Sequence, residues 1–270
     1  SSSGGIGLLK GYVESFLMAN GLPIYAAGSG YHGDETLDNV KADRDGRLQL
    51  FVFGESNYLP FTTNNRETVY HFTPVLAPAR TDQMGDVTGY RIRKGESFDW
   101  EQNSFGDGYS ETAQIVFRGT EALLNYMEAQ YMRDGSLDAS SQNYWRAIRS
   151  RAGVSTDFQA TINATDISQE AAGDWGAYSS GNLLSDRTLY NIRRERRCEF
   201  VGEGMRWDDL VRWCAMDQLI NNPYMPEGVN FWTSMYETAI YNEMHAEITY
   251  VEGPTNPDAN ISSSEESVYV

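Results

Sequence analysis

The chain has 270 residues, of which 40% are hydrophobic and 22% charged, and its formal net charge is -17. This length can form one large domain or two small ones. Because nucleic acids and anionic membrane surfaces would repel so negative a chain, the charge argues against both as partners.

The first predicted element is an amphipathic helix over residues 8–20. Apolar side chains recur there at the spacing of one helix face. They are Leu8, Leu9, Tyr12, Val13, Phe16 and Leu17. The Asn20-Gly21 pair would end this helix with a residue in the left-handed region.

Residues 21–58 are predicted to be irregular, because four glycines fall within residues 21–33. The sequence D-R-D-G-R-L follows at Asp43–Leu48. A calcium loop is a weak interpretation of it, since an EF-hand has its glycine at the sixth position and Gly46 stands at the fourth. We predict a short strand at 49–53.

Residues 54–112 show no sustained periodicity, apart from an alternating segment at 87–95 that predicts a short strand. A long irregular region within a compact domain is often functional. Regular helices are predicted beyond it, at 111–131 and 139–151, with a turn at Gly135 between them. A polar connection over 155–185 follows, with a short helix at 167–172.

The densest run of charged residues lies at 186–213. Asp186 is suited to cap one helix, glycines at 202 and 204 allow a turn, and 206–213 predicts a second helix. The apolar face of this second helix would comprise Trp207, Leu210, Val211 and possibly Cys214. Because acids alternate with the arginines at i+3 and i+4, this run is not a nucleic-acid patch.

Charges beside an apolar stripe are costly to bury unless they are paired. We therefore expect Arg196, Glu199 and Glu203 to join a partly buried network of ion pairs. The two cysteines, Cys198 and Cys214, are too few for a disulfide framework, and we expect two free, buried thiols.

The run I-R-R-E-R-R-C-E-F-V-G-E-G-M-R-W-D-D-L-V-R-W resembles the C-terminal signature of the SusD/RagB family. The matching positions are Ile192, Arg193, Glu195, Arg196, Arg197, Glu199, Glu203, Gly204, Arg206, Asp209, Leu210, Arg212 and Trp213. Weaker similarity to the family is found at Arg44–Leu48, Arg118–Ala129 and Ile148–Val154.

The resemblance implies a mainly α, SusD-like fold with tetratricopeptide-type helix pairs, a large irregular loop region and few short strands. It also implies that residues 1–270 are the C-terminal part of a longer protein. A loop-rich, ligand-side region would occupy about 21–110, a helical region about 111–216, and a partial tail 217–270. Residues 231–244 of that tail are a possible helix.

Family members are outer-membrane, cell-surface lipoproteins that bind a glycan, or in some cases a peptide, and deliver it to a SusC-like TonB-dependent transporter. The resemblance thus implies non-catalytic glycan binding, with an oligosaccharide and the transporter as partners. The chain opens S-S-S-G-G without a signal peptide, so the lipid anchor would belong to the full-length protein. A scaffold that acts mainly through the transporter interface is an alternative.

The sequence offers little support for an enzyme. Its three histidines, His32, His71 and His245, lack metal-site spacing, and no nucleophile elbow or phosphate-binding loop is present. We therefore predict no metal and no cofactor. A glycoside hydrolase remains an alternative, because with 38 acidic residues some catalytic pair can always be proposed.

Sugar binding needs exposed aromatic rings beside groups that bond hydroxyls, and the aromatic content is 13%. The predicted ligand-binding residues lie in the glycine-rich loop region and are Tyr25, Tyr31, His32, Asp34, Asn57 and Tyr58. Tyr70 and Trp100 are weaker candidates. Structural roles are predicted for Arg193, Glu195, Arg196, Glu199, Glu203, Arg206, Asp209, Arg212 and Trp213.

Overall fold

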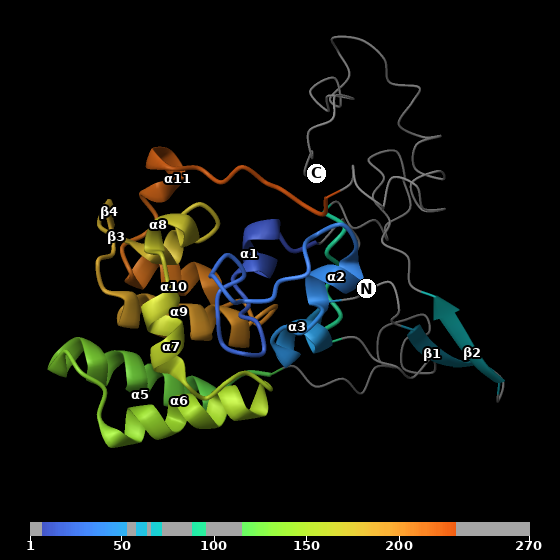
Figure 1. Ribbon diagram of the computed structural model, residues 1–270, viewed down its shortest axis with the longest axis horizontal. Helices are drawn as coiled ribbons and strands as arrows, with labels where there is room; N and C mark the ends of the chain where they lie inside the picture. The colour runs from blue at the N-terminus through green and yellow to red at the C-terminus, as the bar shows by residue number, and fades with distance from the viewer. Residues whose placement is uncertain (1–6, 53–57, 64–65, 72–87, 96–114, 231–270) are drawn as a thin grey trace, which may run out of the picture.

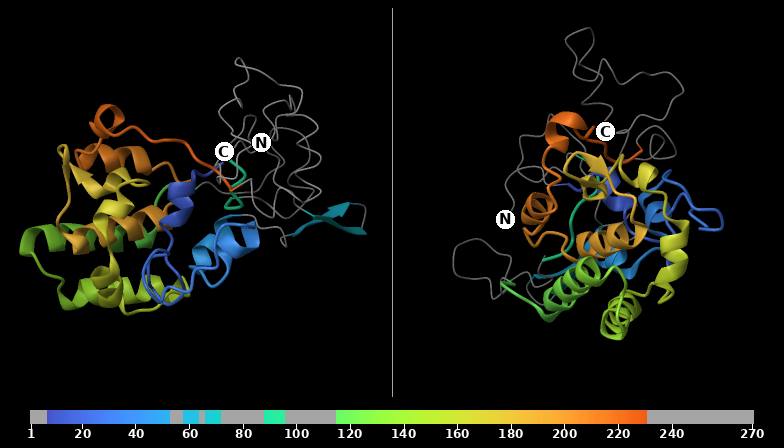
Figure 2. Two further views of the ribbon diagram at one scale, coloured as in Figure 1. Left: turned by 45° about the horizontal axis from the view of Figure 1, so that its top comes forward. Right: turned by 90° about the vertical axis from the view of Figure 1, so that its left-hand side faces the viewer.

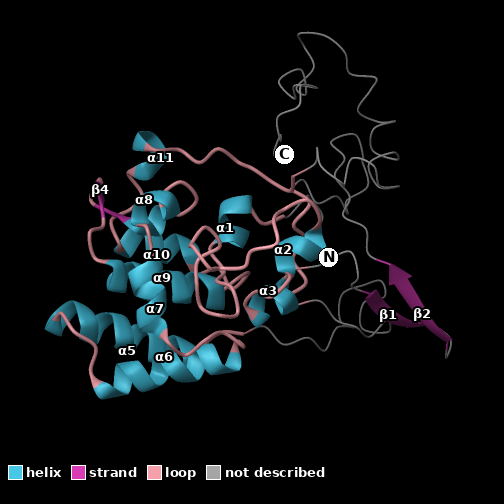
Figure 3. Ribbon diagram, in the orientation of Figure 1, coloured by secondary structure: helices cyan, strands magenta, loops and turns pink. Residues whose placement is uncertain are grey.

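The computed structural model describes residues 7–52, 58–63, 66–71, 88–95 and 115–230. These residues form a mainly helical fold in which strands occur only as two short antiparallel hairpins (Figure 3). The predicted fold class is therefore confirmed. The possible helix at 231–244 lies outside the described residues.

The elements in the first half of the chain are short. They are α1 (Lys10–Glu14), α2 (Leu37–Lys41), α3 (Gly46–Phe51), β1 (Tyr58–Thr63) and β2 (Arg66–His71). The second half carries the helical body. Its elements are α5 (Gly119–Asp134), α6 (Ala139–Arg151), α7 (Phe158–Ala164), α8 (Ile167–Glu170), η1 (Trp175–Ala177), β3 (Tyr178–Ser179), β4 (Asn182–Leu183), α9 (Arg187–Glu199), α10 (Arg206–Arg212) and α11 (Gln218–Asn221).

Helix α9 lies at the centre of the fold. It packs against α5, α7 and η1, and α1 to α3 lie on the side of the fold nearer the β1–β2 hairpin (Figures 1 and 2). Every residue from Tyr190 to Glu199 is buried. The helix begins where predicted, because the Asp186 carboxylate accepts hydrogen bonds from the amides of Thr188 and Leu189 at 2.9 and 3.0 Å.

Helices α5 and α6 form the helical pair that the sequence predicts. Gly135 ends α5 in the left-handed region, at φ 69°, and the Asp138 carboxylate caps α6. Apolar side chains of the pair, among them Leu124 and Trp145, form one core with Ile192 of α9. Helix α5 starts at Gly119, and residues 115–118 before it are not helical. Residues 111–114 lie outside the described part.

The predicted helix at 8–20 is wrong beyond Glu14, where α1 ends. The physical reason is a buried guanidinium. Arg44 Nη2 donates hydrogen bonds to the carbonyl oxygens of Val13 and Phe16 at 2.7 and 2.6 Å. These carbonyls are the acceptors that a continuing helix would need, so the chain turns while Phe16 remains fully buried.

The predicted strand at 49–53 is also wrong, because residues 46–51 form α3. Asp45 starts this helix by accepting a hydrogen bond from the Arg47 amide at 2.8 Å. Only Val52 pairs as in a sheet, in an isolated bridge to Ile92. The segment predicted as a strand at 87–95 contributes isolated bridges at Arg91 and Ile92.

Helix α10 begins at the predicted residue and ends one residue early, but only part of its predicted apolar face is buried. Trp207 and Val211 are 61% and 51% exposed, whereas Leu210 is buried. Arg196 of α9 binds the carboxylate of Asp209 at 2.7 Å, and this ion pair turns the Asp209 side of α10 inward. Cys214, at the end of the same outer face, is exposed, so the prediction of a buried thiol holds only for Cys198.

Two glycines let α1 approach the turn that follows α8. A Cβ added at Gly173 would lie 2.7 Å from the Cα of Gly11. The Arg197 guanidinium donates to the carbonyl oxygens of both, at 3.3 Å for Gly11 and 2.8 Å for Gly173. The atoms nearest to the added Cβ are backbone atoms of Gly11, so rotation of a side chain cannot relieve the clash.

We predict that Gly173→Ala lowers the free energy of unfolding by about 1–3 kcal/mol, because the added methyl group forces the two backbones apart. Urea denaturation measures the change. Gly119→Ala is the matched control: it adds the same methyl group at the start of α5, where nothing lies within 4 Å. Equal stability of the two variants would contradict the close approach.

Candidate functional site

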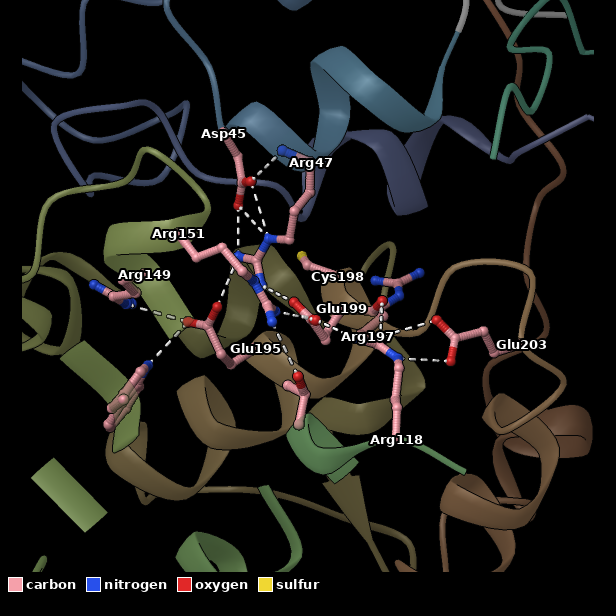
Figure 4. A network of polar contacts seen from close by, with 12 residues as sticks. Asp45, Arg47, Arg118, Arg149, Arg151, Glu195, Arg197, Cys198, Glu199 and Glu203 are labelled. Atoms are coloured by element: carbon pink, nitrogen blue, oxygen red, sulfur yellow. Dashed lines mark hydrogen bonds and ion pairs between the residues drawn. The ribbon is translucent and has the colours of Figure 1, made fainter. Parts of the chain in front are cut away.

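The carboxylates of Glu195 and Glu199, one turn apart on α9, share Arg47 from α3 (Figure 4). Arg47 Nη2 lies 2.6 Å from Glu195 Oε1, and Arg47 Nη1 lies 3.1 Å from Glu199 Oε2. Asp45 holds the same guanidinium at 2.6 Å. The motif at Asp43–Leu48 therefore joins the N-terminal helices to the centre of the fold.

Each of these two glutamates also binds the α5–α6 side of the fold. Glu195 Oε2 accepts hydrogen bonds from Arg149 Nε at 3.1 Å and from Trp145 Nε1 at 2.9 Å. Glu199 pairs with Arg118 at 2.6 Å and with Arg151. Both carboxylates therefore connect three parts of the chain that are distant in sequence.

Glu203, just beyond α9, lies within the same network. Its carboxylate accepts from Arg118 Nε at 2.9 Å and pairs with Lys94. The network expected for Arg196, Glu199 and Glu203 is present, although Arg196 binds Asp209 rather than either glutamate.

The remaining residues with predicted structural roles form a second set of contacts around α10. Arg212 pairs with Glu128 of α5 at 2.6 Å, and the indole Nε1 of Trp213 donates to the same carboxylate at 2.6 Å. Arg206 pairs with Asp174, while Arg193 Nη1 donates to the Gly176 carbonyl oxygen at 3.0 Å. These contacts fix α10 to α5 and to the start of η1, and they fix η1 to the central helix.

The chemistry of this network differs from that of a glycosidase. Burial by itself raises the pKa of Glu195, but Arg47 and Arg149 outweigh burial and lower the pKa to about 2. The pKa of Glu199 is lowered by Arg47 and Arg118 in the same way. A general acid needs a raised pKa, so these carboxylates are fixed as anions and are unsuited to donate a proton.

The glycine-rich loop over residues 21–34 brings together four predicted ligand-binding residues: Tyr25, Tyr31, His32 and Asp34. Three glycines, Gly28, Gly30 and Gly33, have positive φ and no atom within 4 Å of an added Cβ. The middle of this loop therefore faces open space.

The loop is fixed internally by short polar contacts. Asn20 Nδ2 donates to the carbonyl oxygens of Gly28 and Ser29 at 3.3 and 3.1 Å, and Ser29 Oγ donates to the Ile24 carbonyl oxygen at 2.8 Å. The side chain of Ser29 is buried. A loop held in this way is largely preformed before any ligand binds.

Tyr31, His32 and Asp34 each contact groups outside the loop. The guanidinium of Arg44 lies 5.6 Å from the centroid of the Tyr31 ring. His32 Nε2 lies 2.9 Å from Asp43 Oδ2, and both side chains are exposed. Asp34 accepts a hydrogen bond from Asn230 at 3.1 Å.

Two of the other candidates, Tyr58 and Tyr70, lie in the β1–β2 hairpin and not in this loop. Tyr58 opens β1 and pairs with His71 of β2, and Tyr70 pairs with Leu59 in the same hairpin. That hairpin projects beyond α3, away from α5 to α11 (Figures 1 and 2). Asn57 and Trp100 lie outside the described residues.

Sequence reasoning missed several residues on which the loop and network depend. Arg47, Arg149, Arg194 and Glu170 are all buried or nearly so and ion-paired. The match at Arg44–Leu48 was a usable signal for Arg47. Glu170 lay in a segment predicted as a polar connection, and nothing in its spacing indicated a buried partner.

The sequence model of the SusD family matches residues 1–264. The chain belongs to the SusD family. A crystal structure of a SusD-like protein from Bacteroides fragilis NCTC 9343 is similar to it, with a TM-score of 0.56 and 20% sequence identity. At this identity the likeness shows the fold. A search of curated proteins found no match.

The alignment with the Bacteroides fragilis structure covers 84% of this chain and 39% of that one, so the chain spans about two fifths of the length of its SusD-like neighbour. Within the described ranges of this SusD-family chain, no helix is both long and apolar enough to cross a bilayer. Nor do His, Cys, Asp and Glu side chains of these ranges gather in a group of three or more that could hold a metal ion.

We predict that Glu199→Ala lowers the free energy of unfolding by about 1.5–3 kcal/mol without selectively abolishing ligand binding, because Arg47 loses one of its three carboxylate partners and keeps Asp45 and Glu195. Thermal and urea denaturation measure the loss. Arg133→Ala serves as control, since its ion pair with Asp134 is exposed and its removal should leave the melting temperature unchanged. Selective loss of binding in a fully folded Glu199→Ala protein would assign this residue to the ligand site instead.

The lowered pKa of Glu195 predicts acid sensitivity. A glutamate ordinarily titrates at 4.5, and this one at about 2, so the unfolded chain binds a proton more readily than the folded one. The stabilisation is therefore complete above pH 4.5 and is lost as the pH falls through 2. Urea titrations at pH 7, 4.5, 3 and 2 test this, and a constant free energy of unfolding down to pH 2 would contradict it.

Proposed function

We propose that this chain is the C-terminal part of a non-catalytic, cell-surface protein that binds an oligosaccharide and delivers it to a SusC-like TonB-dependent transporter. The observation that carries the proposal is the family match over residues 1–264. Membership of the SusD family supports glycan binding for nutrient uptake, an outer-membrane location and a lipid anchor in the full-length protein. The net charge of -17 suits a neutral ligand.

The part of this chain best suited to contact a sugar is the loop over residues 21–34. It carries the ring of Tyr31 and the polar groups of His32 and Asp34, and its backbone is held by internal contacts. A sugar presents an apolar face for stacking and hydroxyl groups for hydrogen bonding, so a loop that carries a ring, a carboxylate and an imidazole offers groups of both kinds. Preorganisation of the loop reduces the entropy lost on binding.

The electrostatics of the central network argue against its glutamates as catalytic acids. Glutamates at the centre of the molecule are fixed as anions by arginines, and the pKa of Glu195 is about 2. A glycoside hydrolase requires one carboxyl group that stays protonated until it donates its proton to the leaving group. The proposed role therefore uses these acids only to hold the fold.

A second candidate role is that of a scaffold or lid that acts mainly through the transporter interface. Exposed apolar side chains on the outer face of α10 and on α11 favour it, with Trp207 61%, Val211 51% and Ile220 87% exposed. Such side chains are typical of surfaces that contact another protein. Capture of a peptide in place of a glycan is the other alternative.

We predict that Tyr31→Ala weakens oligosaccharide binding at least about fivefold, because loss of a stacking ring at a binding centre costs more than 1 kcal/mol. Isothermal titration with cello-, xylo-, malto- and mannohexaose measures the affinity. Tyr126→Ala on α5 is the matched control, since it removes an exposed ring far along the chain from the loop.

Two results would contradict the proposal. Absence of binding to any glycan or peptide by the full-length protein would favour the scaffold role. Sustained release of reducing sugar by the pure protein would favour a hydrolase. Unchanged affinity in Tyr31→Ala, with binding intact in the parent protein, would move the site away from this loop.

A further inference from the structure

The carboxylate of Glu170, at the end of α8, lies between the 21–34 loop and the central helix. On the loop side, the hydroxyl of Tyr25 donates to Glu170 Oε1 at 2.7 Å. On the α9 side, the hydroxyl of Tyr190 donates to Glu170 Oε2 at 2.9 Å, and Arg194 forms an ion pair with the same carboxylate. Both oxygens of one side chain are thus engaged: Tyr25 and Arg194 share Oε1, and Tyr190 binds Oε2.

The hydroxyl of Tyr25 is fully used inside the protein. Besides donating to Glu170, it accepts a hydrogen bond from the Asp166 amide at 2.9 Å. Asp166 in turn caps α8 by accepting from the Ser168 amide at 3.0 Å. Burial raises the pKa of Tyr25, as expected for a phenol held within a polar cluster. This arrangement leaves the ring fixed and gives the hydroxyl no role toward a ligand.

A second connection fixes the start of the loop to the same helix. Thr161 Oγ1 donates to the Gly21 carbonyl oxygen at 2.6 Å and accepts from Arg149 Nη1 at 2.7 Å. Arg149 Nε donates to Glu195 of α9 at 3.1 Å. The loop therefore meets the core at Gly21 and at Tyr25, whereas a Cβ added at Gly28, Gly30 or Gly33 would meet nothing within 4 Å.

We propose that Tyr25 and Glu170 are positioning residues. They fix the first part of the 21–34 loop to α9 and thereby determine the positions of Tyr31 and His32. Tyr25 itself does not contact the ligand. The consequence for ligand affinity rests on the proposed function, whereas the consequence for loop order does not. The sequence predicted that Tyr25 contacts the ligand. Its hydrogen bonds instead indicate that it holds the loop in place.

Tyr25→Phe tests the proposal, with Tyr190→Phe as the matched control. Each variant removes one hydroxyl that donates to Glu170, but Tyr25 belongs to the loop and Tyr190 to the fully buried face of α9. The order of the loop is measured by amide hydrogen exchange of the full chain at pH 7. The reporting amides are those of Ala26, Ser29 and Tyr31, which are hydrogen-bonded within the loop.

We expect exchange at these three amides to quicken about fivefold or more in Tyr25→Phe, the equivalent of one lost hydrogen bond, while exchange in α9 stays at the parent rate. In Tyr190→Phe the loop amides should exchange at the parent rate. Unchanged loop exchange in Tyr25→Phe, or equal acceleration in both variants, would overturn the positioning role.

Binding of the four hexaoses named above separates this inference from the proposed function. If the parent protein binds one of them, Tyr25→Phe should weaken that binding about fivefold in parallel with the faster loop exchange, and Tyr190→Phe should not. Weaker binding with unchanged loop exchange would mean that Tyr25 contacts the sugar directly, and would overturn the inference. If the parent binds none of the four, the exchange rates still decide whether Tyr25 and Glu170 fix the loop, and the proposed function fails only if no other glycan or peptide binds to the full-length protein.

Discussion

The fold depends on neutralising the charged residues of α9. From Tyr190 to Glu199 the helix is buried on all sides, yet Arg193, Arg194, Glu195, Arg196, Arg197 and Glu199 all lie within this span. An unpaired charge in such a place is prohibitively costly. Each residue therefore requires a partner, and the partners come from elements on both sides of α9 in the chain, among them α3, α6, α8 and α10.

This requirement helps to explain the positions of α3 and α10. Helix α3 is placed by Arg47, which binds both glutamates of α9, and α10 by Asp209, which binds Arg196. Apolar packing then fills the spaces, as in the stacking of Trp145 on Phe158 at a centroid distance of 4.7 Å. A buried ion pair contributes little net stability compared with an apolar pair, but it strongly disfavours any arrangement that separates the partners.

The same network extends to the surface loop that we propose as the ligand site. Glu195 reaches Gly21 through Arg149 and Thr161, and α9 reaches Tyr25 through Glu170. A rigid interior can thus hold an exposed, glycine-rich segment without an apolar core beneath each of its residues. Such a design separates the residues that hold a binding surface from those that face the ligand, so the surface can vary while the support stays the same.

The sequence by itself determined the regular helices and the family. Helices α6, α9 and α10 have the predicted bounds within a residue or two, because their caps and periodicity are local signals read within a few residues. The run at 192–213 was sufficient to indicate the SusD family, and it also indicated that its charges must be paired.

Tertiary structure alone decided which residues pair and which faces are buried. Arg44 ends α1 early by binding carbonyl oxygens of Val13 and Phe16, and Arg196 turns α10 so that Trp207 faces outward. Tyr25 resembled a ligand residue because it stands in a loop, and its partner Glu170 lies 145 positions away in the chain. Periodicity carries no information about contacts at that separation. Only the folded chain brings such groups within hydrogen-bond distance, where the cost of leaving a buried charge or hydroxyl unpaired selects one arrangement.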